Sequence, residues 1–241
     1  MTLALAHARA MTLELARHPA YVVPTLAFPA VFFLFFAAPA SGDAAVRMAT
    51  FAGFAAIGVA FFQFGVGIAV ERASPWETYL RTLPAGVTVR LVARLCSAAV
   101  FAGAAAAIVV AVALAVGGVA LPAGAWAEVA GVLAGGTIPF ALLGVAIGYW
   151  APARGALPIA NLLYLGLSYG GGLWVRPERL PRLVQRVSPL LPTRALADAL
   201  TRATAGGGPP ARSLAALAVF AVAFAGLAAL GYRRDEGRRY G

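Results

Sequence analysis

Long apolar stretches separated by short polar ones form the main pattern of this chain. Six stretches carry no charged side chain, and they are 24, 23, 33, 25, 21 and 20 residues long. A helix rises about 1.5 Å per residue, so about 20 apolar residues cross the roughly 30 Å of bilayer hydrocarbon. The pattern therefore predicts an all-α integral membrane protein with six transmembrane helices in a single transmembrane domain. The expected spans cover about residues 20–40, 48–70, 95–116, 129–150, 155–175 and 214–232 of the domain 1–241.

Two further segments have helical apolar patterns but also carry charges. Residues 3–15 have a broad apolar side interrupted by charged and histidine positions. This fits an N-terminal interfacial helix better than the uninterrupted apolar centre of a signal peptide. Residues 178–204 repeat apolar positions at helical spacing, with arginines off the apolar stripe. They predict short interfacial helices that lie at or dip into the membrane surface before the sixth span.

The polar island between the second and third expected spans, residues 71–84, carries its own helix signals. Ser74 suits the N-cap and Pro75 suits the first helical position. Glu77 lies three residues after Ser74, which is the spacing of a capping box. Pro84 ends the helix, because its ring clashes with the preceding turn.

The helix predicted by these signals, over residues 75–83, is amphipathic. One side holds Trp76, Tyr79, Leu80 and Leu83, while Glu77 and Arg81 face elsewhere. A helix of about two turns is marginal alone in water. We therefore expect it to be held by a partner's groove or by lipid headgroups.

Composition agrees with a membrane protein. Hydrophobic residues make up 61% of the chain, and charged residues make up 12%, about half the share in a soluble domain. The net charge is +10, and all 19 basic residues are arginine. Arginines beside spans commonly anchor them at the membrane surface, so we expect membrane lipid and no nucleic acid as a partner. Cys96 is the only cysteine, which excludes an intrachain disulfide.

Several kinds of catalytic machinery are missing from the sequence. Without lysine there is no G-x-x-x-x-G-K-[ST] phosphate-binding loop, so the chain does not hydrolyse ATP by that route. The only histidines, His7 and His18, precede the first span. This excludes an intramembrane serine–histidine protease and a histidine-ligated metal site in the bilayer. We predict no enzymatic activity and no catalytic, cofactor-binding or metal-binding residue in this chain.

Gln63 and Asn161 are the polar residues nearest the middle of an expected span. No Asp, Glu or Arg occurs there, whereas ion-coupled carriers usually need such groups as relays or binding sites. An amide within a span either makes an interhelical hydrogen bond or contacts a substrate. Both residues are therefore candidates for a substrate path.

The distribution of arginines indicates an orientation. With six spans, the side that holds both termini and the island has 11 arginines, and the other side has 8. An excess of arginine marks the cytoplasmic side. We therefore expect both termini in the cytoplasm and the arginine-rich section before the sixth span on the outside.

The overall layout resembles the permease subunits of type-2 ABC exporters. The shared features are an N-terminal interfacial segment, six spans, a polar helix after the second span and interfacial helices before the sixth. The stretch from Glu71-Arg72 to Leu80 and then Thr82-Leu83-Pro84 is similar to the family's cytoplasmic motif, which has a Glu-Arg pair, a Gly-Thr pair, Leu residues and a closing Pro. Here Ser74-Pro75-Trp76 stands where the Gly-Thr pair is expected.

The resemblance implies a permease in the bacterial inner membrane. It implies that the island is a coupling helix, which docks in a groove of a separate ATP-binding cassette subunit that holds ATP and Mg. It also implies a second permease subunit, identical or related, with an interface built largely by the first and fifth spans. The partner-binding residues would be Glu71, Arg72, Trp76, Glu77, Tyr79, Leu80, Arg81 and Leu83.

Three functions stay open at this point. The first is export of a hydrophobic or amphipathic substrate, such as a drug, an antibiotic, a lipid or a lipid-linked glycan. The second is a membrane scaffold that uses the same island to recruit a cytoplasmic partner without moving a substrate. The third is an ion-coupled carrier, which the lack of charges in the spans disfavours.

Overall fold

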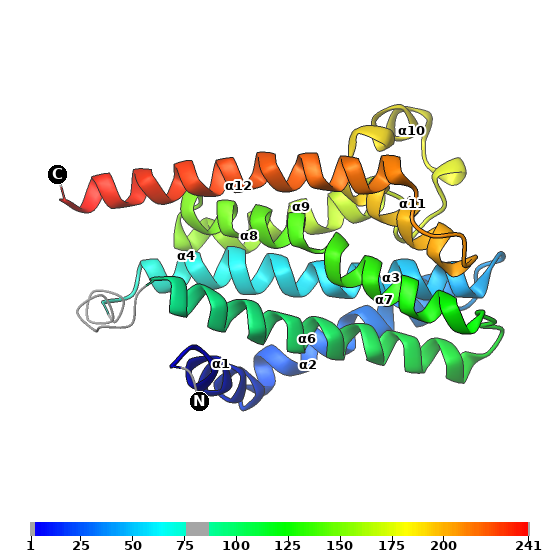
Figure 1. Ribbon diagram of the computed structural model, residues 1–241, viewed down its shortest axis with the longest axis horizontal. Helices are drawn as coiled ribbons and strands as arrows, with labels where there is room; N and C mark the ends of the chain where they lie inside the picture. The colour runs from blue at the N-terminus through cyan, green and yellow to red at the C-terminus, as the bar shows by residue number, and fades with distance from the viewer. Residues whose placement is uncertain (1–2, 76–86, 241) are drawn as a thin grey trace.

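The computed structural model describes residues 3–75 and 87–240, and within these ranges the chain is helical with no strand. The helices form an elongated bundle with most axes along its length (Figure 1). The first half contains α1 (Leu3–Ala16), α2 (Pro19–Phe32), η1 (Phe33–Ala37), α3 (Ala44–Ala60), η2 (Phe61–Val66), α4 (Gly67–Arg72) and α6 (Val87–Val116). The second half contains α7 (Ala123–Gly136), α8 (Ile138–Trp150), α9 (Ala153–Gly170), η3 (Pro177–Arg179), α10 (Arg182–Val187), η4 (Ser188–Leu190), α11 (Pro192–Thr204) and α12 (Ala211–Tyr240).

The all-helical class is confirmed, and five helical segments of the described residues are long and apolar enough to cross a membrane. They are Pro19–Ala37, Ala44–Arg72, Val89–Val116, Ala123–Trp150 and Ala211–Glu236, which correspond to the first, second, third, fourth and sixth expected spans. The remaining expected span, 155–175, corresponds to α9, which ends at Gly170. The chain turns there, and Gly172 has φ +83°, a conformation that favours glycine. The count of six spans therefore stays a prediction.

The segment Ala44–Arg72, made of α3, η2 and α4, is the buried centre of the bundle. It begins at Asp43, whose carboxylate accepts the Ala45 N–H at 2.8 Å and so caps the helix. Glycines allow α8 to approach it closely. A Cβ on Gly144 would lie 2.7 Å from the Ala60 carbonyl oxygen. The two backbones can meet at this distance only because the side chain is absent.

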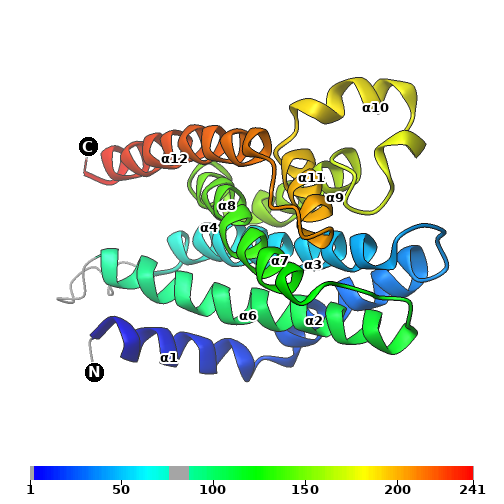
Figure 2. The ribbon, with the colours of Figure 1, turned by 45° about the vertical axis from the view of Figure 1, so that its right-hand side comes forward.

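The segments expected at the membrane surface pack on the bundle. Figure 2 shows α1 beside the first half of α6, and the two helices are in contact. The helix α11 packs against α3, α7 and α12, with Leu196 and Leu200 fully buried. In contrast, Leu183 of α10 is 74% exposed. Which of these helices lies at a membrane surface stays a prediction.

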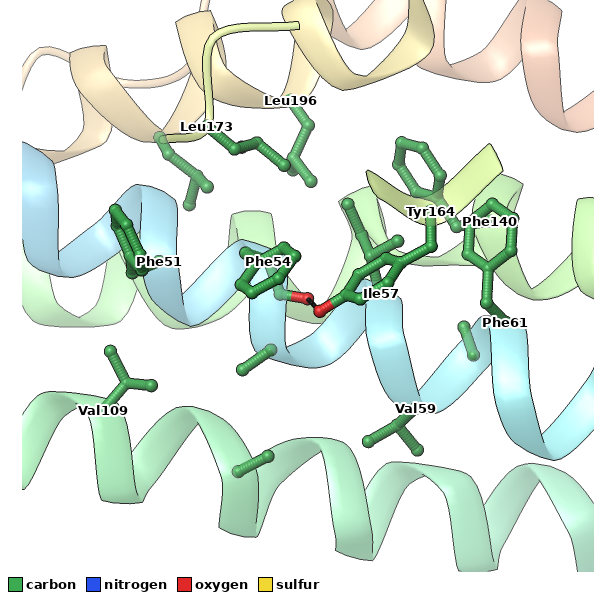
Figure 3. Packing of buried hydrophobic residues seen from close by; sticks show 14 of the residues in the cluster. Phe51, Phe54, Ile57, Val59, Phe61, Val109, Phe140, Tyr164, Leu173 and Leu196 are labelled. Carbon is green, nitrogen blue, oxygen red and sulfur yellow. Dashed lines mark hydrogen bonds between the residues drawn. The ribbon is translucent and has the colours of Figure 1, made fainter. Parts of the chain in front are cut away.

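An aromatic cluster joins α9 to the central segment (Figure 3). The ring of Tyr164 stacks on that of Phe54, with centroids 4.6 Å apart and planes 3° from parallel. The Tyr164 hydroxyl also donates to the Phe54 carbonyl oxygen at 3.1 Å. Trp174, just beyond α9, meets the Phe54 ring edge-on, with the two ring centroids 5.2 Å apart. These contacts fix α9 against α3 beside the cavity described below.

Gly58→Ala should loosen this attachment. A Cβ at position 58 would lie 2.8 Å from the Tyr164 hydroxyl oxygen, so the ring would have to shift and lose its hydrogen bond to Phe54. We expect a loss of about 1–3 kcal/mol of stability, typical of overpacking together with a lost buried hydrogen bond. Thermal unfolding in detergent measures it. Gly103→Ala is the matched control, because no atom lies within 4 Å of its Cβ. Equal melting temperatures for the two variants would contradict the prediction.

Candidate functional site

Of the predicted coupling region, the structure describes only the residues that lead into the helix, up to residue 75. The helix α4 ends at Arg72, and the Ser74 N–H donates to the Glu71 carbonyl oxygen at 2.9 Å. The structure therefore places Glu71 and Arg72 of the predicted partner-binding residues. Six others lie outside the described residues and stay predictions: Trp76, Glu77, Tyr79, Leu80, Arg81 and Leu83.

A buried arginine of α6 connects the end of the central segment to the bundle. The Arg94 side chain is 8% exposed and forms an ion pair with the Glu71 carboxylate. Its Nη1 also donates to the Gln63 carbonyl oxygen at 2.7 Å. A guanidinium buried to this extent needs such partners, because an unpaired charge in an apolar environment is costly. Sequence reasoning missed this pair, since Arg94 comes one residue before the expected third span.

The backbone around Gln63 is shaped to receive this arginine. Gln63 belongs to η2, a π-helical turn within the central segment, and such turns occur frequently at functional sites. Gly67 follows η2, and a Cβ there would lie 2.8 Å from Arg94 Nη1. Glycine at position 67 therefore leaves the space that the guanidinium occupies.

Arg72 is attached to a different part of the bundle. Its Nη1 forms an ion pair with the Asp235 carboxylate of α12 at 2.6 Å. The guanidinium also lies over the Tyr149 ring, 5.5 Å from its centroid, and Nη2 donates to the Ala151 carbonyl oxygen at 3.4 Å. Two consecutive residues at the end of α4 thus bind two different long helices, with Glu71 bound to α6 and Arg72 to α12.

A cavity of about 620 Å³ lies against the same end of the central segment. Its walls come from α1, α2, α3, η2, α4, α6 and α9, and most of the lining is apolar. The lining residues are Met11, Leu15, Ala20, Tyr21, Pro24, Thr25, Phe28, Pro29, Ala55, Gly58, Val59, Phe62, Gln63, Val66, Gly67, Val70, Glu71, Arg94, Leu157, Asn161, Tyr164 and Leu165. An apolar cavity with a few polar groups suits a hydrophobic or amphipathic ligand.

Both residues of the predicted substrate path line this cavity. Gln63 is 4% exposed, and its Nε2 donates to Ser97 Oγ at 3.5 Å, which is an interhelical contact. Its Oε1 is buried with no hydrogen bond of normal geometry, and the same holds for the hydroxyl of Tyr21, which lies close to the Gln63 and Thr25 side chains. Asn161 is half-buried, and its side chain makes no hydrogen bond to another described residue. The cavity thus holds a few polar side chains within an apolar lining.

No group of three or more His, Cys, Asp or Glu side chains within residues 3–75 and 87–240 is close enough to hold a metal ion.

Comparison with known proteins agrees with the geometry. Residues 3–203 match the sequence profile of the family "ABC-2 type transporter". The chain is also 24% identical over 183 residues to the protein named "Putative transport permease YvfS" of Bacillus subtilis (strain 168). That alignment covers 76% of this chain and 75% of the relative. With the family profile covering most of an all-helical chain rich in membrane-spanning helices, this protein belongs to the ABC-2 type transporter family of membrane permeases.

Proposed function

We propose that this protein is the permease subunit of an ABC exporter that moves a hydrophobic or amphipathic molecule across the bacterial inner membrane. Permeases of this family are transmembrane subunits that are not themselves the ATPase, and they generally work with an ATP-binding subunit. In this proposal ATP and Mg bind to that partner, and this chain supplies the passage. No covalent chemistry takes place here.

The observation that carries the proposal is the continuity between the cavity and the approach to the coupling helix. Glu71 lines the cavity, pairs with Arg94, and lies three residues before the expected N-cap at Ser74. A displacement of the coupling helix by the partner would therefore reach the cavity wall through one ion pair. A partner whose nucleotide states bind the coupling helix differently would bias the permease between inward-open and outward-open arrangements.

We place the second permease subunit against α2 and α9. Both helices line the cavity, and both carry large apolar side chains that are exposed in the single chain. Phe35 of η1 and Leu162 of α9 are 74% and 75% exposed. A second copy, or a related chain, would cover this surface and enclose the cavity between the two subunits. With both termini in the cytoplasm, the Arg72–Asp235 end faces the ATP-binding subunit.

Gln63→Leu and Asn161→Leu should impair transport without separating the complex. Each change removes a polar group from the cavity and leaves its volume similar. We expect about a fivefold to tenfold loss of ATP-driven uptake of the hydrophobic dye Hoechst 33342 into inverted membrane vesicles, since one lost hydrogen bond contributes about 1 kcal/mol. Gln185→Leu makes the same chemical change on α10, away from the cavity, and should transport as the unchanged protein does.

The scaffold alternative predicts a different result. In that case the ATP-binding partner would still co-purify, but neither dye uptake nor substrate-stimulated ATPase activity would appear in reconstituted vesicles. Uptake driven by a pH gradient without ATP would instead favour an ion-coupled carrier.

A further inference from the structure

A second cavity lies at the opposite end of the bundle from the Arg72–Asp235 pair. It has a volume of about 330 Å³ and lies between the turn before α3 and the connection from α9 to α11. Figure 1 shows these two segments at the same end of the molecule, away from the C-terminal end of α12. None of the residues that line this cavity lines the first one, and the permease proposal does not use it.

Three arginine side chains converge on the turn formed by Ser41 and Gly42. If Gly42 carried a Cβ atom, that atom would lie 3.7 Å from Arg176 Nη1 and 4.0 Å from Arg47 Nη1. Both guanidinium groups therefore lie beside Gly42. Arg47 Nη1 donates to the Gly42 carbonyl oxygen. Arg179 Nη2 donates to Ser41 Oγ at 3.0 Å. Residues far apart in the sequence thus bring three positive charges to one turn.

These three charges have no carboxylate partner among the described residues. The ion pairs of the described part of the chain do not include Arg47, Arg176 or Arg179. Three carboxylates also line the cavity, but Asp43 caps α3 and Asp198 pairs with Arg194 at 2.8 Å. The third is the exposed Glu178. In addition, Nε of Arg47 is buried without a hydrogen-bond partner. The cavity thus holds four arginines, Arg194 included, and three carboxylates, with Arg176 and Arg179 exposed, and its net positive charge attracts an anion.

Alongside its polar residues, the cavity wall has apolar and aromatic residues. Phe36, Phe51 and Trp174 line it beside the arginines, and Phe36 is 51% exposed. A ligand that fits both surfaces has an anionic head and an apolar body. Guanidinium groups match phosphate oxygens geometrically and bind them with two parallel hydrogen bonds.

From this arrangement we infer a binding site for the phosphate group of an amphiphile, held by Arg47, Arg176 and Arg179. The phosphate can come from a lipid headgroup or from free phosphate, and the experiment separates the two sources. The site does not depend on the transport proposal, because lipid binding can be measured on the purified protein alone.

The test is a titration of the full-length protein, purified in a neutral detergent, with dihexanoyl phosphatidylglycerol, with inorganic phosphate and with dihexanoyl glycerol. Thermal unfolding and microscale thermophoresis report binding. We expect saturable binding of the phosphatidylglycerol and no binding of the dihexanoyl glycerol, which lacks the phosphate. Competition by inorganic phosphate would show that the phosphate alone suffices, and its absence would show that the acyl chains are also required; either result supports the site.

Arg176→Gln is the informative variant, because the Arg176 side chain makes no hydrogen bond to another described residue and its loss should not disturb the fold. It should weaken phosphatidylglycerol binding about tenfold, and a double variant with Arg47→Gln should weaken it further. Arg186→Gln removes an exposed arginine of α10 outside the cavity and should leave binding unchanged. Equal binding by the Arg176→Gln and Arg186→Gln variants, or equal binding of the phosphate-free lipid, would overturn the inference.

Discussion

Replacing Leu80 and Leu83 with aspartate should separate this protein from the proposed ATP-binding subunit. Both leucines belong to the predicted apolar side of the coupling helix, and docking in a groove would remove them from water. Burial of each leucine contributes about 1.5–3 kcal/mol, and a carboxylate in the same place is costly to desolvate. We therefore expect the affinity of the two subunits to fall at least about a hundredfold. Co-purification and the ATPase activity of the reconstituted complex measure the loss.

The matched control is Leu183→Asp with Leu190→Asp, which adds the same charges in and beside α10, at the end of the bundle away from the Arg72–Asp235 pair (Figure 1). These leucines are 74% and 73% exposed within the chain, so the change removes little packing from the bundle and should leave the partner's affinity unchanged. If the Leu80→Asp, Leu83→Asp variant keeps the partner and its ATPase activity, the coupling site lies elsewhere and the proposed function loses its mechanism.

The second large effect is expected at the Glu71–Arg94 pair. Glu71→Gln removes the carboxylate and leaves a buried guanidinium with the Gln63 carbonyl oxygen as its remaining partner. We expect a loss of about 1–2 kcal/mol in unfolding free energy, because Arg94 is buried but the Glu71 side chain is 53% exposed and solvent screens the pair in part. Gly67→Ala should cause a loss in the same direction by displacing Arg94. Unfolding of the protein in mixed detergent micelles measures both changes.

A double-mutant cycle with Arg94→Met separates the pair from other effects. If the two groups interact, the double variant should lose less stability than the two single losses added together, by about 1–2 kcal/mol. Asp198→Asn is a control with the same change from acid to amide. Its ion pair with Arg194 is half-exposed and spans one helical turn, so its loss should cost about 0.5 kcal/mol or less. Additive losses for Glu71→Gln and Arg94→Met would contradict the role assigned to this pair.

Much of the fold follows from local patterns. Charge-free runs located five helices that are long enough to span a membrane, because hydrocarbon thickness sets a length that can be read along the chain. The helix α9 is shorter than its charge-free run. It ends at Gly170, and the turn that follows packs against the start of α11. This contact joins segments distant in the sequence, so the local pattern does not predict where α9 ends.

The site could be predicted only in part, for the same reason. Gln63 and Asn161 stand out as polar positions in apolar spans, and they line one cavity. Arg94 gave no such signal, because its partner Glu71 lies in the preceding helix and only the fold brings them together. The convergence of Arg47 and Arg176 on Gly42 is likewise a contact between distant segments.

The attachments of Glu71 and Arg72 restrict how the central segment can move. Successive side chains on a helix point about 100° apart, and here one is tied to α6 and the next to α12. Rotation of the segment about its own axis would lengthen at least one of these two ion pairs. In the proposed transport cycle, a push delivered beyond Arg72 would therefore tilt α4, α6 and α12 together as a block.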